Sequence, residues 1–236
     1  MSAIARRLRH LDWNRLSDDL DADGVAVTAA PVLSDDECAS VRAGFGCESS
    51  FRATVVMQRH GYGEGVYRYY RYPLPPVVAE LREAAYPYLA GVANRWQQWS
   101  GGERYPGTLE QLLSRCAEAG QRRPTPLVLR YGPGGHNALH RDRYGDVAFP
   151  LQLAVALSDP GEDFTGGESV FVEQRPRSQS RATVVSMPRG HAVLFANDGR
   201  PVPGARGWKT VHLRHGVSTV RSGCRMALGV IFHDGG

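Results

Sequence analysis

The chain has 236 residues, of which 42% are hydrophobic and 22% charged, and its formal net charge is +4. This length suits one domain or at most two small ones, and the apolar content is that of a globular protein, which excludes a disordered or fibrous chain. The small positive excess permits contact with phosphates but does not by itself indicate a dedicated nucleic-acid binder.

The cysteines indicate the compartment. Cys38, Cys47, Cys116 and Cys224 lie far apart, and the sequence contains no Cys-x-x-Cys pair. We therefore expect neither a structural zinc site nor a disulfide framework, and we expect the protein to lie in a reducing cytoplasm. Since no apolar run is long enough for a signal peptide or a membrane span, we expect a cytoplasmic protein without membrane contact.

The first half of the chain, residues 1–125, has a mainly helical pattern. After a short strand at residues 24–27, we predict helices that begin near residues 34, 76 and 108. The signals are two capping boxes (Ser34 with Glu37, Thr108 with Gln111), a first-turn Pro76, a terminating Gly120, and Pro87 as a kink or break. These helices are expected to form one layer.

The second half, residues 126–236, consists of short runs rich in Val, Ile, Leu and Phe, separated by Gly and Pro. The predicted strands are residues 127–131, 149–157, 169–172, 182–187, 191–196, 210–213 and 225–232. Their spacing is typical of an antiparallel sandwich or barrel and not of β-α-β units. We therefore predict an α+β fold in a single domain of residues 1–236, with a jelly-roll core and the helical layer packed on it.

One triplet, His140-Arg141-Asp142, follows a predicted strand and the glycine-rich turn at residues 132–135. On an extended segment, residues 140 and 142 lie on the same face, so both side chains point toward one place. A second triplet of this type, His10-Leu11-Asp12, lies in an arginine-rich, predicted helical segment, and we interpret it as a solvated helix face.

A catalytic metal needs a third ligand and open positions, and His215 is the candidate. Two histidines and one carboxylate on one face of an octahedron leave three positions open, which is the arrangement of non-haem Fe(II) sites. Arg225, ten residues further on, is expected beside the metal, where it can bind a carboxylate bidentately. His212 is the alternative, but its odd spacing from His215 puts the two on opposite faces, and the spacing to Arg225 favours His215. We interpret His136 and His233 as solvated or structural.

The order of these motifs resembles that of the Fe(II)/2-oxoglutarate-dependent oxygenases. H-x-D is followed by TGGE at residues 165–168, by P-x-G-x-x-x-L-F at 188–195, and by H-x-V-x-x-V-x-x-G-x-R at 215–225. The sequence is similar, more closely, to a bacterial family of this superfamily that is predicted to act on damaged nucleobases. This resemblance covers nearly the whole chain, including residues 67–69, 72–76, 94–96, 122–126, 137–140, 173–177 and 214–217.

The resemblance implies a double-stranded β-helix fold, with His140, Asp142 and His215 as Fe(II) ligands and Arg225 as the partner of the distal carboxylate of 2-oxoglutarate. Tyr131 lies nine residues before His140, the interval at which AlkB-type enzymes place a tyrosine that hydrogen-bonds this cosubstrate. The implied reaction uses O2, converts 2-oxoglutarate to succinate and hydroxylates a C–H bond. If that carbon is an N-methyl group, formaldehyde is released, which would be an oxidative demethylation in DNA repair.

Residues 67–72 interleave tyrosines with arginines, a composition typical of surfaces that stack bases and contact phosphates. The same alternation also suits a strand with tyrosines packed on the helices and arginines outside. Candidate substrate residues are Tyr69 and Arg71 here, Arg143 and Tyr144 after the metal motif, and Arg206 and Trp208 on an expected loop at 197–208. An extruded base of single-stranded or damaged nucleic acid could stack among them.

Two alternatives stay open. The ten-residue interval to Arg225 is that of prolyl hydroxylases, whereas AlkB-type enzymes place this arginine further along and add a second one where this chain has Ile231. Residues 24–38 also resemble the start of a prolyl-hydroxylase-type domain, so a protein or a small molecule is an alternative substrate. The non-enzyme alternative is a cupin-like jelly roll that binds a ligand without turnover, and the complete set of ligands argues against it.

Overall fold

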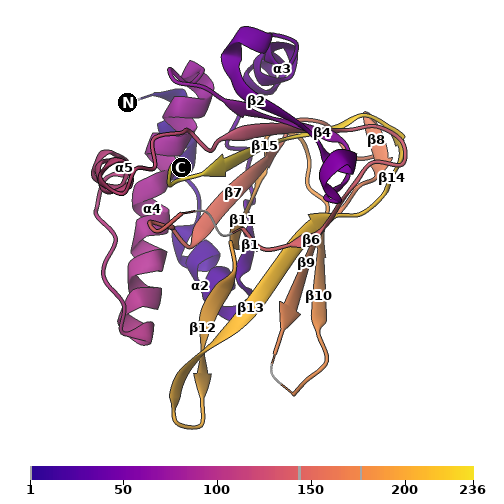
Figure 1. Cartoon of the computed structure of the whole chain (residues 1–236). Helices are drawn as coiled ribbons and strands as arrows, with labels where there is room; N and C mark the ends of the chain where they lie inside the picture. Colours follow the sequence, from indigo (N-terminus) through magenta and orange to yellow (C-terminus); the bar gives the residue numbers. More distant parts are fainter. Residues whose placement is uncertain (1, 143–144, 176) are drawn as a thin grey trace.

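The computed structural model describes residues 2–142, 145–175 and 177–236, and their strands form two antiparallel sheets that face each other (Figure 1). The major sheet contains, in spatial order, β1 (Val25–Val27), β11 (Ala192–Ala196), β7 (Leu151–Ala156), β15 (Arg225–Ile231), β5 (Leu127–Tyr131), β4 (Val66–Tyr70) and β2 (Phe51–Val56). The minor sheet contains β10 (Arg181–Val185), β9 (Ser169–Gln174), β13 (Gly207–Val217), β6 (His136–His140) and β3 (Gly63–Glu64), and β12 (Gly199–Gly204) also pairs with β13. β8 (Phe164–Gly166) pairs separately with β14 (Val220–Gly223). The predicted jelly roll is confirmed.

The helices form the predicted layer beside the sheets. They are α1 (Ala3–Arg9), α2 (Trp13–Asp23), α3 (Asp35–Gly44), α4 (Pro76–Ser100) and α5 (Leu109–Glu118), with 3-10 turns η1 (Glu48–Ser50) and η2 (Met57–His60). α4 contacts α1, α2, α5 and β15, and it shares one hydrophobic core with the major sheet. In the described ranges, none of the helices combines the length and hydropathy that a membrane span needs.

Sequence patterns placed the helix starts correctly. Ser34 and Glu37 form a capping box at α3, and the Thr108 hydroxyl accepts the Gln111 backbone N–H at α5. Pro87 was predicted as a kink or a break, and it is not a break, because α4 continues through it. Pro87 lies on the exposed side of α4, and the buried side chains before and after it anchor the helix to the core.

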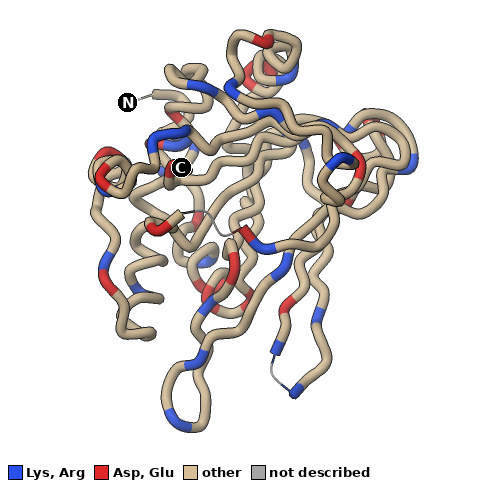
Figure 2. The backbone as a smooth tube through the Cα atoms, in the orientation of Figure 1, with Lys and Arg blue, Asp and Glu red and all other residues tan. Residues whose placement is uncertain are grey.

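Two stretches of chain differ from the predicted elements. The mainly helical half also contains β2, β3 and β4, and β4 pairs with β5 to extend the major sheet. The expected loop at residues 197–208 is the β12–β13 hairpin, in which Pro201 and Pro203 lie on an outer strand that tolerates proline. Figure 2 shows Lys and Arg at the ends of this hairpin and of the β9–β10 hairpin beside it.

Candidate metal centre and cavity

Three predicted ligands converge on the inner side of the minor sheet. His140 ends β6, Asp142 follows two residues later, and His215 on β13 is the register partner of His140. The Asp142 carboxylate lies 3.5 Å from Nε2 of His140 and 3.2 Å from Nε2 of His215. Candidate ligand atoms of the three residues all lie within 4.8 Å of one another. This spacing allows one cation to contact all three side chains.

Hydrogen bonds hold two of these ligands in place. Nδ1 of His140 lies 2.8 Å from the Ala138 carbonyl, and a donor there leaves the Nε2 lone pair free for a metal. Nε2 of Gln152, on β7, donates to Oδ2 of Asp142 at 2.6 Å, and the Asp142 backbone N–H donates to the Asn197 carbonyl. The carboxylate is therefore oriented from the opposite sheet as well as from its own backbone.

The Asp142 carboxylate is ionised despite being buried. Burial raises its pKa, but the imidazoles of His215 and His140 and the amide of Gln152 together outweigh this and hold the pKa well below its usual range. Burial and the neighbouring His215 lower the pKa of His140, so its imidazole is held neutral. A deprotonated carboxylate and a neutral imidazole are the forms that bind metals.

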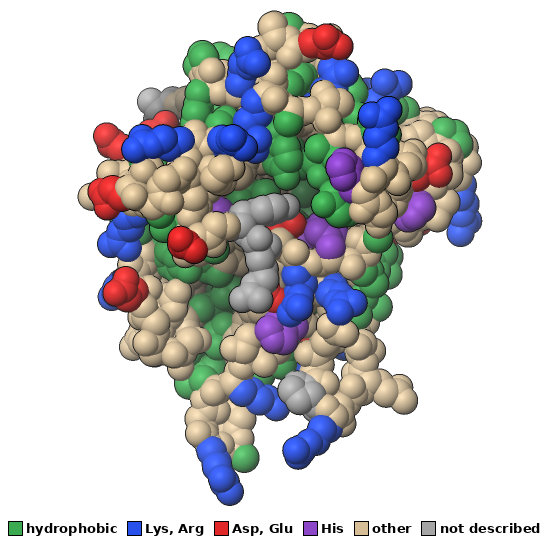
Figure 3. All heavy atoms as spheres, viewed as in Figure 1, with side chains coloured by type: hydrophobic (Ala, Val, Ile, Leu, Met, Phe, Trp, Pro, Cys, Tyr) green, Lys and Arg blue, Asp and Glu red, His purple; other side chains and the backbone are tan. Residues whose placement is uncertain are grey.

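A cavity of about 840 Å³ lies between the two sheets, with the three ligands on its wall. Most of its lining is apolar, including Leu129, Leu153, Val193, Phe195 and Ile231. Figure 3 looks onto the side where histidine side chains gather beside a hollow with hydrophobic walls. The cavity is large enough for a small dicarboxylate together with part of a second molecule.

Arg225 and Tyr131 form a polar pair inside this cavity. They are register partners on β15 and β5, and the guanidinium lies over the Tyr131 ring at 5.5 Å. Arg225 is 8% exposed and donates to Oγ of Ser169, and no carboxylate of the described residues forms an ion pair with it. The buried Tyr131 hydroxyl has no hydrogen bond of ordinary geometry to the described part of the chain. A buried guanidinium beside a buried hydroxyl favours the binding of an anionic ligand.

The pKa shifts of this pair have the same origin. Burial lowers the pKa of Arg225, against the opposing effects of Tyr131 and Glu168. Burial also raises the pKa of Tyr131 to about 12, and Arg225 and the Asn137 side chain oppose that shift. Tyr131 is therefore a neutral hydroxyl that can donate a hydrogen bond, beside a cation that the apolar surroundings destabilise.

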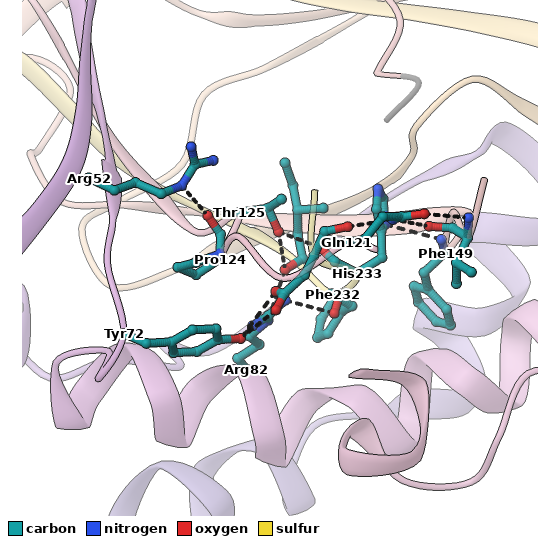
Figure 4. A network of polar contacts seen from close by, with 12 residues as sticks. Arg52, Tyr72, Arg82, Gln121, Pro124, Thr125, Phe149, Phe232 and His233 are labelled. Atoms are coloured by element: carbon teal, nitrogen blue, oxygen red, sulfur yellow. Dashed lines mark hydrogen bonds and ion pairs between the residues drawn. The ribbon is translucent and has the colours of Figure 1, made fainter. Parts of the chain in front are cut away.

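A buried network anchors the other end of β15 to the helical layer (Figure 4). Arg82 of α4 donates to the carbonyls of Ile231 and Phe232 and forms a 2.8 Å ion pair with Asp234. The Tyr72 hydroxyl also contacts Asp234. Because β15 is fixed here, the position of Arg225 at its beginning is tied to the helices.

The structure places the predicted substrate residues in different regions. Tyr69 lines the cavity, with the Tyr67 ring edge-on at 5.4 Å, whereas Arg71 does not line it. Trp208, in the β12–β13 hairpin, stacks on Trp99 of α4, and Arg206 lies in the turn of that hairpin. Neither Trp208 nor Arg206 lines the cavity. The predicted positions Arg143 and Tyr144 lie outside the described residues.

Two other histidines, His212 and His233, lie outside the candidate metal centre, as the sequence predicted. His212 is exposed, and its ring contacts Asp198 at 3.0 Å instead of the metal centre, as its odd spacing from His215 predicts. His233 is fully buried and accepts the Phe149 backbone N–H, which agrees with a structural interpretation. Sequence reasoning missed Gln152, whose only signal is an amide inside an otherwise apolar strand.

The minor sheet of this jelly roll carries a His-x-Asp…His set, and the major sheet places a buried arginine in the same cavity. This combination defines the class of Fe(II)/2-oxoglutarate-dependent oxygenases, which use Fe(II), 2-oxoglutarate and O2. Within that class, residues 65–235 match the model of a family described as an oxygenase catalysing oxidative methylation of damaged DNA. The chain belongs to this family.

Known proteins are similar to the chain in sequence or in fold. An uncharacterised protein of Mycobacterium tuberculosis is 49% identical over 163 residues, which are 69% of this chain and 70% of that protein. A Pseudomonas putida prolyl-4-hydroxylase shares the fold with a TM-score of 0.55 at 15% identity, covering 92% of this chain and 96% of its own. A Burkholderia pseudomallei 2OG-Fe(II) oxygenase family protein does so with a TM-score of 0.51 at 17% identity, covering 94% and 92%.

Proposed function

We propose that His140, Asp142 and His215 hold Fe(II), and that Arg225 and Tyr131 bind the distal carboxylate of 2-oxoglutarate. The observation that carries this assignment is the buried Arg225 guanidinium without a carboxylate partner among the described residues, in the cavity that the three ligands line. When bound, Fe(II) with 2-oxoglutarate and O2 supplies an oxidation that yields succinate and CO2 and hydroxylates a substrate C–H bond.

The residues of the chain do the positioning in this proposal. Gln152 holds one oxygen of Asp142 at 2.6 Å and so directs the other toward the shared cation position. Arg225 and the neutral Tyr131 hydroxyl orient the dicarboxylate, and the apolar walls exclude water from the reacting carbon. We also propose that residues 1–236 act as one domain, since the Arg82 network joins α4 to the end of β15.

We further propose that the substrate is an N-alkylated nucleobase in DNA, whose repair is an oxidative demethylation. The family description, which names damaged DNA, supports this substrate. The aromatic wall of Tyr67 and Tyr69 also supports it, because a flat base can stack on such rings inside the cavity. Hydroxylation of an N-methyl carbon gives a hemiaminal, which breaks its C–N bond to leave formaldehyde and the unmethylated base.

The test combines two measurements. Succinate release from 2-oxoglutarate with ferrous iron should fall to background in Asp142→Ala, while His212→Ala, a histidine outside the ligand set, keeps the wild-type rate. Formaldehyde should appear with N-methylated single-stranded DNA. Equal succinate release in wild type and Asp142→Ala would refute the metal centre. Mass gain of one oxygen on peptides, with no formaldehyde from any methylated oligonucleotide, would refute the nucleobase and favour a protein substrate.

A further inference from the structure

Two neighbouring hairpins extend from one end of the minor sheet. β9 ends at Gln174, which pairs with His212 of β13, so the β9–β10 turn and the β12–β13 turn leave the sheet at the same end (Figure 1). The six residues from His215 to Lys209 on β13 span roughly 20 Å at 3.3 Å per residue. The β12–β13 hairpin therefore extends outward from the metal centre on the strand that carries His215.

Exposed cations follow these hairpins. Arg214 lines the cavity next to His215, Lys209 and Arg206 lie further out on the same hairpin, and Arg177 lies in the β9–β10 turn. None of these four forms an ion pair with a carboxylate of the described residues. In Figure 3, Lys and Arg side chains continue from below the hollow to both hairpin ends.

Other arginines of the same region form ion pairs. Arg141 pairs with Asp198, and Arg175 pairs with Glu173, a carboxylate that the buried Arg200 also contacts. The contrast shows that the unpaired cations of the hairpins are not simply the local background of an arginine-rich chain. An extended row of unpaired cations attracts a polyanion, because each phosphate contact releases condensed counterions.

An aromatic platform accompanies this row. The Trp208 ring stacks on Trp99 with centroids 4.3 Å apart and an interplanar angle of 3°, and Trp208 remains 45% exposed. Trp99 fixes the orientation of the indole, and Trp208 lies two residues from Arg206 in the hairpin turn. Rings beside cations are the usual composition of surfaces that bind single strands by stacking and phosphate contact.

We propose that Arg177, Arg206, Lys209 and Arg214, together with Trp208, form a binding track for single-stranded nucleic acid that leads to the cavity. Phosphates of the strand contact the cations, and a base next to the target stacks on Trp208. This inference rests on the proposed function, because it assumes that the nucleotide entering the cavity belongs to a longer strand. The outer residues of the track, Arg177, Arg206, Trp208 and Lys209, do not line the cavity, so they contribute binding without chemistry.

The test uses the full chain and a labelled, unmethylated single-stranded DNA of about 12 nucleotides, within the site sizes known for such surfaces. The hairpin variant is Arg177→Ala with Arg206→Ala and Lys209→Ala. The matched control removes three exposed arginines that have no ion pair among the described residues and lie away from the hairpins: Arg6→Ala, Arg9→Ala and Arg122→Ala. Both variants lose three positive charges, so a difference between them reports position and not net charge.

The slope of log affinity against log salt should decrease by about 2 in the hairpin variant, since each single-strand phosphate contact contributes about 0.7. A fourfold rise in salt would then weaken wild-type binding about 16-fold more than it weakens binding by the hairpin variant. The control should keep the wild-type slope. DNA should quench tryptophan fluorescence in the wild type and less so in Trp208→Leu.

Equal slopes in the hairpin and control variants, at unchanged thermal unfolding midpoints, would overturn the track. So would tighter binding of a polyglutamate peptide than of DNA, which would indicate an acidic protein partner. Failure of the proposed function is a separate result, because it shows as absent formaldehyde from a methylated trinucleotide, which is too short to reach the hairpins. In that assay the hairpin variant should match the wild type.

Discussion

Arg225→Met provides a demanding test of the cosubstrate site, because it should change binding and stability in opposite directions. Arg225 is 8% exposed, its guanidinium donates to Ser169, and it has no carboxylate partner among the described residues. Methionine fills a similar volume without a charge. The variant therefore removes the proposed partner of 2-oxoglutarate and also removes a buried cation that the folded protein must desolvate.

The two effects have different magnitudes. A carboxylate bound bidentately loses two charge-assisted hydrogen bonds of about 1.5–3 kcal/mol each, so 2-oxoglutarate affinity should fall by more than about 100-fold. Without 2-oxoglutarate, the buried charge is uncompensated, and burial lowers the pKa of Arg225 because the charged form is disfavoured there. Replacing it with an apolar side chain should stabilise the unliganded fold by about 1–3 kcal/mol.

The assays are titration calorimetry of 2-oxoglutarate in the presence of Mn(II), which avoids turnover, and denaturant unfolding of the unliganded protein. Arg221→Met, an exposed arginine four residues away, should leave both quantities unchanged. Wild-type affinity in Arg225→Met would refute the assignment of the carboxylate partner. Reduced affinity with reduced stability would instead indicate that the variant has damaged the fold.

Three further predictions concern the surroundings of the site. Gln152→Leu should weaken Mn(II) binding about 10–100-fold, measured by electron paramagnetic resonance, because the Asp142 carboxylate loses its 2.6 Å donor; unchanged affinity would contradict this role. Arg82→Leu should lower the free energy of unfolding by about 3–5 kcal/mol in urea, because Asp234 stays buried without its cation, and a loss below about 1 kcal/mol would count against the network. Burial and Arg82 lower the pKa of His233 to about 4, whereas an unfolded histidine titrates near 6.5. Between these values the unfolded chain binds more protons, so His233 should lower stability as pH drops from about 6.5 to 4, by up to about 3 kcal/mol, and His233→Gln should show a correspondingly smaller loss than the wild type.

The strands nearest the site were predictable because they are buried and clearly bounded. Leu127–Tyr131 matches the predicted strand at both ends, where Pro126 and Gly132 bound it, and Arg225–Ile231 matches to within one residue after Cys224. β13 was predicted only at residues 210–213, although it extends over Gly207–Val217. Its outer part carries exposed Trp208 and Lys209, which have no apolar alternation to indicate a strand.

The convergence of the candidate metal ligands could be predicted from sequence for a different reason. His140 and Asp142 lie two residues apart on an extended segment, so their common direction follows from the strand period alone. The parity of His212 and His215 likewise decides which ring faces inward, and the structure places His212 against Asp198. Gln152 escaped prediction because its role depends on β7 facing β6 across the cavity, a relation that no local spacing contains.

The aromatic wall of the cavity comes from the part of the chain that was hardest to predict. On β4, Tyr67 and Tyr69 line the cavity, while Arg68 donates to the Phe45 carbonyl after α3 and lies over the Phe45 ring at 4.8 Å. One strand thus faces the cavity on one side and the helical layer on the other. Cofactor residues must keep fixed spacings on the sheets because the chemistry fixes their geometry, whereas β4 can shift with the helices that hold it. Substrate selection in this protein should therefore respond to changes near Phe45 that leave Mn(II) and 2-oxoglutarate binding intact.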